Sequence, residues 1–235
     1  MRYAIYYTPP ADDPLTRQAA QWLGRDAFSG GDVVQPALTS FSQAALDMLT
    51  ADARRYGFHA TLKAPFELAE DMSEAALISA LDDIAASTPS FTLPQLVIGQ
   101  IGRFFALVPA DWHPQLQLLA DTCVSRLDAF RAPLSNADLA RRKPETLTER
   151  QRRHLAEWGY PYVFDDFQFH MTLTAQVDHA DQPAMREALE NHFEGVVPSP
   201  RDIGHLALFV EPARGSHFKL KHIFQLADAA GRKTA

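Results

Sequence analysis

The sequence predicts an α+β fold built from a repeated unit, on the evidence of two observations. Short apolar runs alternate with amphipathic stretches along the 235 residues, as in proteins that mix strands with helices. In addition, the pattern Phe-His-Ala-Thr-Leu at 58–62 returns as Phe-His-Met-Thr-Leu at 169–173, with four of five positions identical. Self-similarity of this kind indicates a duplicated lobe with pseudo-two-fold symmetry.

The first half is expected to run strand, helix, strand, helix, strand. The first strand is an apolar run that ends at Pro9-Pro10, and the helix after it has a proline in its first turn, where proline is tolerated. Ser73 is suited to cap the second helix. The expected elements are strand 3–7, helix 14–24, strand 58–66, helix 73–86 and strand 91–97.

The second half repeats this order and adds a hairpin. The run at 104–109 matches that at 3–9, because each is an apolar strand that leads into proline. The next helix has Leu116, Leu119, Cys123 and Leu127 on its inward face. The expected elements are strand 104–108, helix 113–130, strand 167–176, helix 182–193, and strands 203–210 and 218–226, paired around Arg214-Gly215.

Residues 131–166 break the symmetry, because the first half has no counterpart of this length. The segment is locally basic, with Arg141, Arg142 and Lys143 followed by arginines at 150, 152 and 153, and it ends in the aromatic stretch 158–162. Two interpretations are open. An insertion beside a site is often a lid or a specificity wall, whereas the simpler alternative is a solvated helix with an aromatic anchor in the core.

These elements predict a single domain over residues 1–235 made of two pseudo-symmetric lobes. The lobes are expected at about 1–100 and 101–235, with the insertion at 131–166 and the closing hairpin at about 203–226. A chain of this length can bury most of its apolar surface without metals or disulfides.

Composition and charge exclude several classes of protein. The only cysteine, Cys123, has no internal partner, which favours a reducing cytoplasm. The first residues do not resemble a signal peptide, and no apolar run approaches the 18 residues of a membrane span. The 29 acidic and 22 basic residues give a net charge of −7. This charge argues against long nucleic acid as a partner, but a small phosphorylated ligand needs only a local cationic pocket.

The repeated motif predicts two polar strand faces. Because side chains two residues apart share a strand face, Phe58 and Phe169 are expected to face the core with the other apolar members of each motif. The opposite faces are expected to carry the polar side chains, and the two faces would meet across the pseudo-two-fold axis in one cleft. The polar set is His59, Thr61 and Lys63 on the first strand and His170, Thr172 and Thr174 on the second.

Two imidazoles and two hydroxyls in one cleft match the needs of phosphoester cleavage. One imidazole can accept a proton from water or a ribose hydroxyl, and the other can donate a proton to the leaving oxygen, since histidine has both forms near neutral pH. Thr61 and Thr172 can hydrogen-bond the non-bridging phosphate oxygens, and Lys63 can add positive charge. This chemistry needs neither a metal nor another cofactor.

Two alternative interpretations of the motif are open. Either histidine alone could be an ordinary buried residue on a strand, but their recurrence in matching places of a repeat argues against this. Zinc could use two histidine ligands, but the motif offers no Cys, Asp or Glu to complete a site. The sequence also contains no P-loop, no dinucleotide-binding glycine motif and no zincin motif.

The two Phe-His-x-Thr-Leu strands in a duplicated chain resemble the 2H phosphoesterase superfamily, which includes cyclic phosphodiesterases and 2′-5′ RNA ligase-like proteins. The resemblance implies antiparallel sheets with helices outside and a central cleft. It implies that His59 and His170 are catalytic, with Thr61 and Thr172 as their hydroxyl partners.

Longer stretches, at 3–10, 56–66, 132–141 and 158–164, resemble a bacterial branch associated with phosphonate-utilisation operons. That resemblance implies a phosphorylated ribose or a cyclic ribosyl phosphate as substrate. The expected substrate contacts are Lys63, Thr174, Tyr56, Arg141 and Arg142.

Three functions follow as hypotheses. The first is metal-independent hydrolysis of a cyclic phosphodiester of a small nucleotide or ribosyl phosphate. The second is RNA end-processing or 2′-5′ ligation, and the third is a non-enzymatic protein that binds a phosphorylated metabolite in the same cleft. The sequence leaves open which histidine is the acid, and it leaves the oligomeric state open.

Overall fold

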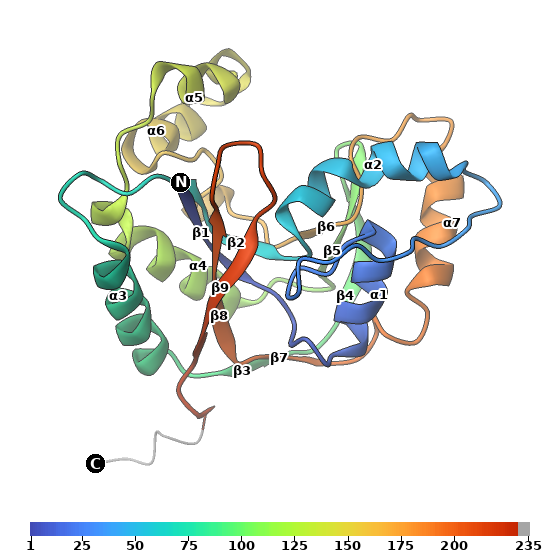
Figure 1. The fold of residues 1–235 in the computed structure, drawn as a ribbon, viewed down its shortest axis with the longest axis horizontal. Coiled ribbons are helices and arrows are strands. Elements are labelled where there is room, and N and C mark those ends of the chain that lie inside the picture. Colours follow the sequence, from blue (N-terminus) through green and yellow to red (C-terminus); the bar gives the residue numbers. More distant parts are fainter. Residues whose placement is uncertain (230–235) are drawn as a thin grey trace.

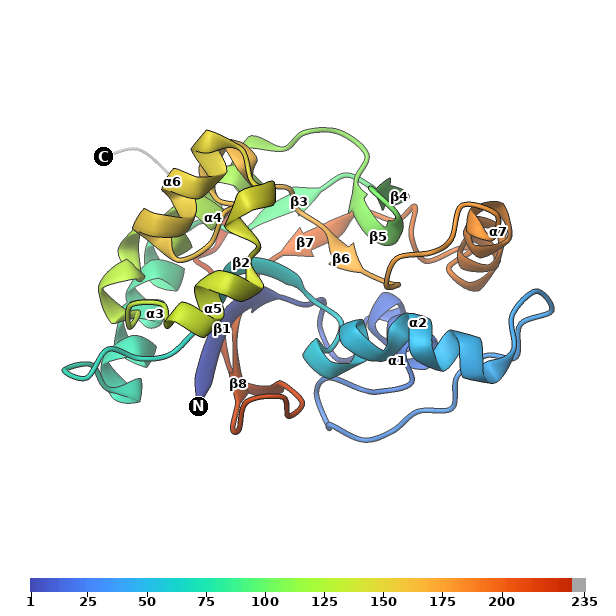
Figure 2. The same cartoon turned by 90° about the horizontal axis from the view of Figure 1, so that it is seen from above.

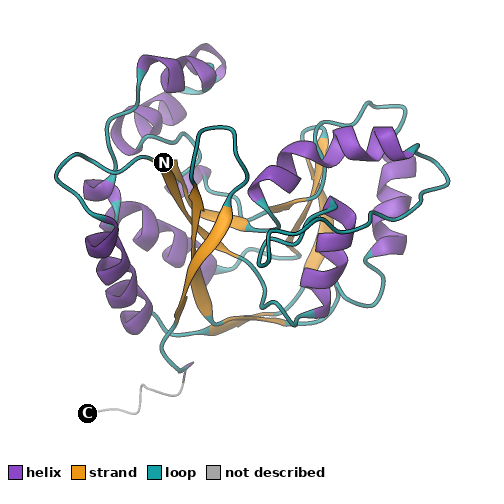
Figure 3. Ribbon diagram, in the orientation of Figure 1, coloured by secondary structure: helices purple, strands orange, loops and turns teal. Residues whose placement is uncertain are grey.

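The computed structural model describes residues 1–229, and in it a seven-stranded sheet runs through the centre of the molecule (Figures 1 and 3). The strand order is β4-β5-β6-β2-β1-β8-β9, and every pairing in it is antiparallel. A separate antiparallel pair joins β3 to β7. The strands are β1 (Arg2–Tyr7), β2 (Ala60–Phe66), β3 (Phe91–Leu93), β4 (Leu96–Ile101), β5 (Phe104–Pro109), β6 (Met171–Thr172), β7 (Arg201–Ile203), β8 (His205–Glu211) and β9 (Lys219–Gln225).

Helices flank the sheet on both sides. Figure 1 shows α3 and α4 on one side of the central strands and α1, α2 and α7 on the other. Figure 2, seen from above, places α5 and α6 on the opposite side of β2 from α2. The α-helices are α1 (Pro14–Leu23), α2 (Gln43–Tyr56), α3 (Glu74–Ser87), α4 (Pro114–Arg126), α5 (Asn136–Arg141), α6 (Glu149–Trp158) and α7 (Gln182–His192), and the 3-10 turns are η1 (Asp128–Phe130), η2 (Pro144–Thr146) and η3 (Phe164–Asp166).

The strand order is symmetric about the contact between β6 and β2. Going outward from that contact, β5 corresponds to β1 and β4 to β8, and β9 is an additional strand. Each half of the sheet contains strands from both halves of the sequence, because β4 pairs with β5 and β8 pairs with β1. The fold is therefore α+β with antiparallel sheets and a repeated topology, and the division into two lobes stays a prediction.

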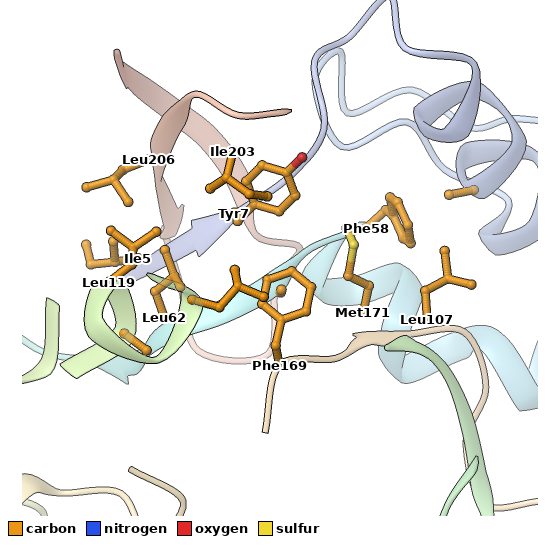
Figure 4. Close-up of a cluster of buried hydrophobic side chains, with 14 of the residues drawn as sticks. Ile5, Tyr7, Phe58, Leu62, Leu107, Leu119, Phe169, Met171, Ile203 and Leu206 are labelled. Carbon is orange, nitrogen blue, oxygen red and sulfur yellow. The ribbon is translucent and has the colours of Figure 1, made fainter. Parts of the chain in front are cut away.

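The apolar faces of the two motif strands meet in the main core. Phe58 and Leu62 from one motif lie among the same buried side chains as Phe169 and Met171 from the other (Figure 4). All four are at most 7% exposed. This confirms the predicted inward faces, and it leaves the opposite face of the same strands for the polar residues.

Most predicted elements are confirmed, including the hairpin at β8 and β9 and the Ser73 cap of α3. Two strand predictions need correction. The expected strand 91–97 divides at Pro94 into β3 and β4, which pair with different partners. The expected strand 167–176 is reduced to β6, because the amides of Leu173 and Thr174 both donate to the carbonyl of Phe105 and leave the regular ladder.

The helix that precedes the first motif, α2, was absent from the prediction. It begins at the Ser42 cap and ends at Gly57, two residues before His59. Within residues 1–229, no helix has the length and apolar character needed to cross a membrane.

Candidate active site

The two motifs lie side by side on the central strands. Ala60 pairs with Met171 in antiparallel register, so the next residues outward place His59 across from Thr172 and Thr61 across from His170. Ala60 and Met171 are fully buried, whereas the four polar side chains are only partly buried. Each histidine thus lies across from the threonine of the other motif, on the sheet face opposite the core.

The first histidine is held in one defined tautomer. Nδ1 of His59 lies 2.8 Å from the carbonyl oxygen of Gly57. Because a carbonyl can only accept, Nδ1 carries the proton and donates it. In the neutral ring, Nε2 then keeps its lone pair, and it lies 3.2 Å from Oγ1 of Thr61, which is the donor in that contact.

The second histidine repeats this local arrangement. Nδ1 of His170 lies 2.8 Å from the carbonyl oxygen of Gln168. As with the first motif, the acceptor is the carbonyl two residues before the histidine. In the neutral ring, Nε2 of His170 is again the nitrogen with the free lone pair. Both motifs therefore present the same nitrogen for proton transfer.

Burial favours the neutral form of both imidazoles. It lowers the pKa of His59 to about 4, an effect to which the nearby His170 adds and which the hydrogen bond to Gly57 opposes. Burial also lowers the pKa of His170, with the bond to Gln168 acting in the opposite direction. Repulsion between the two rings in their charged forms means that they are close enough to influence one another. Two interacting imidazoles are suited to share a single proton.

Aromatic residues surround His59, and one of them, Tyr6, was absent from the sequence-based prediction. Tyr6 pairs with Thr61 in the sheet, and its ring stacks on the His59 imidazole with centroids 3.7 Å apart. Tyr56 lies 6.1 Å from the same imidazole. The only signal for Tyr6 in the sequence was the strand alternation, which places it on the face opposite Ile5 and Tyr7.

Gly57 makes the turn from α2 into the first motif possible. Its φ angle is +82°, in the left-handed region that favours glycine. A Cβ atom at this position would also lie 2.8 Å from the side chain of Ala27. This turn brings Tyr56 and the Gly57 carbonyl next to His59, so the end of α2 shapes the site.

A cavity of about 550 Å³ opens beside the second motif. Thr61 and His170 line it, together with Tyr160 and other residues of the segment that closes the insertion. The cavity carries three carboxylates and one guanidinium, and the guanidinium of Arg150 forms two hydrogen bonds with Asp166. The charged residues of the lining are Asp121, Asp165, Asp166 and Arg150.

Lys63 does not share the cleft with His59, and this prediction was wrong. In the pairing of β1 with β2, Tyr6 lies opposite Thr61, but Ile5 lies opposite Lys63. The extra residue, Leu62, forms a bulge that turns the next side chain to the other face. Lys63 is therefore buried under α4, where its ammonium donates to the carbonyl oxygen of Val124 and to Asp128.

Thr174 is also placed differently from the prediction. It is 1% exposed, and its hydroxyl oxygen accepts a hydrogen bond from the amide of Phe105. The strand alternation that was expected to carry it into the cleft ends at Thr172, where β6 ends. Thr174 thus holds the end of the motif strand against β5.

The two arginines predicted from the insertion have different surroundings. Arg141 is exposed and forms an ion pair with Asp138 at 2.7 Å. Arg142 is partly buried, and its guanidinium carbon lies 4.8 Å from the centre of the Tyr160 ring. Because Tyr160 lines the cavity beside His170, Arg142 is the member of this pair that approaches the site.

The part of the chain that the structure describes contains no ligand set for a metal centre. No group of three or more His, Cys, Asp or Glu side chains there is arranged to hold a metal ion. Cys123 is buried in the core, and burial raises the pKa of its thiol to about 12.

A family model described as "Protein of unknown function (DUF1045)" matches residues 61–219, more than half of the chain. The chain belongs to this family.

Two curated relatives carry the name "Ribose 1,5-bisphosphate phosphokinase PhnN". The one from Janthinobacterium sp. (strain Marseille) is 38% identical over 221 residues, which are 92% of this chain and 49% of that protein. The one from Laribacter hongkongensis (strain HLHK9) is 40% identical over 220 residues, 94% of this chain and 50% of that protein. The chain thus spans about half the length of the curated relatives it matches.

Among solved structures, the chain is similar to E. coli LigT in complex with NADP+. The match has 18% identity and a TM-score of 0.45, and it covers 97% of this chain and 98% of that chain. At these values the likeness carries no information about activity or substrate.

Proposed function

We propose that the protein is a metal-independent phosphodiesterase that opens a cyclic phosphodiester on a small ribosyl phosphate. The observation that carries this proposal is the pair of matched histidines. Each has its Nδ1 proton bound to a carbonyl two residues earlier, which leaves Nε2 unprotonated in the neutral ring. Each also lies across the central strands from the threonine of the other motif.

In the proposed reaction, Nε2 of one histidine accepts a proton from water as the water oxygen attacks phosphorus. The protonated Nε2 of the other histidine donates a proton to the leaving ring oxygen as its bond to phosphorus breaks. The hydroxyls of Thr61 and Thr172 hold the non-bridging oxygens and stabilise the charge that develops on them. One water is consumed, and the products are a phosphomonoester and a free hydroxyl.

The charge of the cavity supports a small polyhydroxy substrate. Three carboxylates and one arginine line it, and carboxylates accept hydrogen bonds from sugar hydroxyls. The same negative charge opposes a polyanion such as RNA. A ribose whose cyclic phosphate lies between the two imidazoles can place its free hydroxyls in this cavity.

The names of the relatives support a more specific substrate. If a ribose carries a phosphate bridging oxygens 1 and 2 and a second phosphate on oxygen 5, cleavage of the bond between phosphorus and oxygen 2 yields ribose 1,5-bisphosphate. This is the compound in the name of the relatives. The chain itself lacks a G-x-x-x-x-G-K-[ST] motif, which argues against kinase activity in the half of the relatives that it matches. The proposed product would then serve a kinase activity elsewhere in those proteins.

The test uses purified protein with EDTA and a panel of cyclic phosphates. The panel contains ribose 1,2-cyclic phosphate, with and without a 5-phosphate, and nucleoside 2′,3′-cyclic phosphates. We expect turnover by the wild type, and a fall in kcat of about 10²- to 10⁴-fold in His59→Ala and in His170→Ala, because each removes one proton-transfer group. His179→Ala is the matched control, since His179 is exposed on a loop.

Melting temperatures of the variants separate loss of chemistry from loss of fold. The proposal fails if no cyclic phosphate is turned over, if EDTA abolishes turnover, or if either histidine variant keeps full activity. Tight binding of a substrate without turnover would instead favour the binding-protein hypothesis.

A further inference from the structure

At the edges of the site, two arginines each stack on a tyrosine. The guanidinium carbon of Arg55 lies 4.2 Å from the centre of the Tyr56 ring, and its Nη2 donates to the Tyr56 hydroxyl at 2.7 Å. This pair ends α2, immediately before the first motif. The second stack joins Arg142, at the end of α5, to Tyr160, which follows α6.

A shared cavity and a shared carboxylate link the two stacks, because Arg142 and Arg2 line one cavity and Arg2 and Arg55 both pair with Glu211. The Tyr56 ring lies 6.1 Å from the His59 imidazole, and the Tyr6 ring stacks on that imidazole at 3.7 Å. Burial, and then the nearby phenols of Tyr56 and Tyr160, raise the pKa of Tyr6. Tyr6 and Tyr56 thus lie beside His59, whereas Tyr160 lines the cavity next to His170 and carries the second stack to the edge of that cavity.

The charge around these phenols is positive. The buried carboxylate of Glu211 is shared by two arginines, Arg2 at 2.5 Å and Arg55 at 3.1 Å. Arg142 forms no ion pair among residues 1–229, and its guanidinium lies against the Tyr160 ring. The cavity that Arg2 and Arg142 line contains five arginines and the two carboxylates of Glu67 and Asp138, an excess of three positive charges in a chain whose net charge is −7.

This charge contrasts with that of the cavity on the His170 side. That cavity carries three carboxylates and one arginine, an excess of two negative charges. A phosphomonoester carries about −1.5 to −2 charge at pH 7, so it is repelled by the cavity and attracted by the arginines. The two sides of the site thus distinguish the two ends of a bisphosphorylated ligand.

We propose that the stacks Arg55–Tyr56 and Arg142–Tyr160 form a subsite for a second, terminal phosphate on the substrate. The inference rests on the proposed function, because it places the cyclic phosphate between the two histidines. The ribose then extends between the two phosphates, with its free hydroxyls towards the acidic cavity. Arginine provides several N–H donors for phosphate oxygens. The ring of each tyrosine holds in place the guanidinium that stacks on it.

The experiment compares two substrates that differ only in the terminal phosphate. The readout is the ratio of kcat/KM for ribose 1,2-cyclic phosphate with a 5-phosphate to that without it. We expect the wild type to favour the phosphorylated substrate, and Arg142→Ala to lower the ratio by about 10- to 100-fold, the effect of losing a hydrogen bond to a charged group. Arg142→Lys keeps the charge but loses the fork of donors, so an intermediate ratio is expected.

Arg153→Ala is the matched control, because Arg153 lies in the same insertion and pairs with Glu149 on the exposed face of α6. It is expected to leave the ratio unchanged. A wild-type ratio near one, or an unchanged ratio in Arg142→Ala, would overturn the subsite.

If neither cyclic substrate is turned over, the proposed function fails, but the subsite can still be judged. Calorimetry with ribose 5-phosphate and with ribose then measures the contribution of the terminal phosphate to binding. Tighter binding of ribose 5-phosphate that weakens in Arg142→Ala supports the subsite, and equal binding of the two sugars refutes it.

Discussion

At the scale of single residues, the two histidines are matched in the hydrogen bond of Nδ1 as well as in sequence. Each donates its Nδ1 proton to the carbonyl two residues earlier, and burial lowers the pKa of each. An enzyme with one acid and one base needs one imidazole protonated and the other neutral. In the free protein that state exists between the two pKa values, the lower of which is about 4.

We therefore expect kcat/KM for the cyclic substrate to peak at acidic pH. Below about 4 both rings become protonated and the base is lost. Above the pKa of His170, which burial holds below its usual 6.5, both rings are neutral and the acid is lost. The measurement is kcat/KM from pH 4 to 9, with His179→Ala as a control that keeps the profile. A plateau that extends to pH 8 would contradict the requirement for an imidazolium in the free enzyme.

At the scale of single elements, the bulge in β2 decides which residues reach the site. Regular alternation would place Lys63 beside Thr61, but the extra residue Leu62 turns it towards α4. Burial lowers the pKa of Lys63 to about 8, against the opposing effect of Asp128. The side chain thus joins β2 to the end of α4 and does not face the imidazoles.

This placement predicts that two substitutions differ in their effect on the free energy of unfolding. Lys63→Met replaces a buried ammonium with an apolar chain of similar length, and it is expected to change stability little, because the part-exposed Asp128 keeps its ion pair with Arg131. Asp128→Ala leaves the ammonium without its carboxylate and is expected to cost about 2 kcal/mol or more, less than for a fully buried pair because Asp128 is a quarter exposed. Urea unfolding measures both changes.

The activity of these variants tests the corrected role of Lys63. Lys63→Met is expected to keep kcat/KM within about threefold of the wild type, a change of under 1 kcal/mol. A loss of more than tenfold in kcat/KM, in a variant of unchanged stability, would show that Lys63 contacts the substrate.

At the scale of the whole molecule, one arginine ties three distant segments together. Arg214, in the loop between β8 and β9, donates to both carboxylate oxygens of Asp138 on α5, at 2.6 and 3.1 Å. It also donates to Glu67, after the end of β2, at 2.8 Å. The hydrogen bonds from Arg214, followed by the one from Ser135, lower the pKa of Asp138 to about 2. The closing hairpin thereby holds the start of the insertion, which carries Arg142.

Arg214→Ala is therefore expected to loosen α5 with little effect on the rest of the fold. Arg214 is nearly half exposed, so the loss in global stability should stay near 1 kcal/mol or below. Hydrogen exchange should rise in residues 136–142 and remain unchanged in β1, whose amides belong to the central sheet. Equal exchange in α5 of the variant and the wild type would show that other contacts hold the insertion.

The sequence by itself determined the α+β class, the duplication, the two motif histidines and the inward faces of their strands. These follow from local physics, because strand alternation and helix caps depend on residues that are close together along the chain. The motif also recurs, so each copy supports the interpretation of the other. The same pattern predicted positions for Lys63 and Thr174 that were wrong, since periodicity continues only as long as the strand remains regular.

Only the tertiary structure decided which other residues meet the histidines. Tyr6 meets the first motif through the pairing of β1 with β2, and Tyr160 reaches the cavity lined by His170 through the folding of the insertion. The bulge at Leu62 and the early end of β6 depend on the partner strands, so no local pattern signals them. The charges that distinguish the two sides of the site come from segments far apart in sequence, and their sum exists only once the chain has folded.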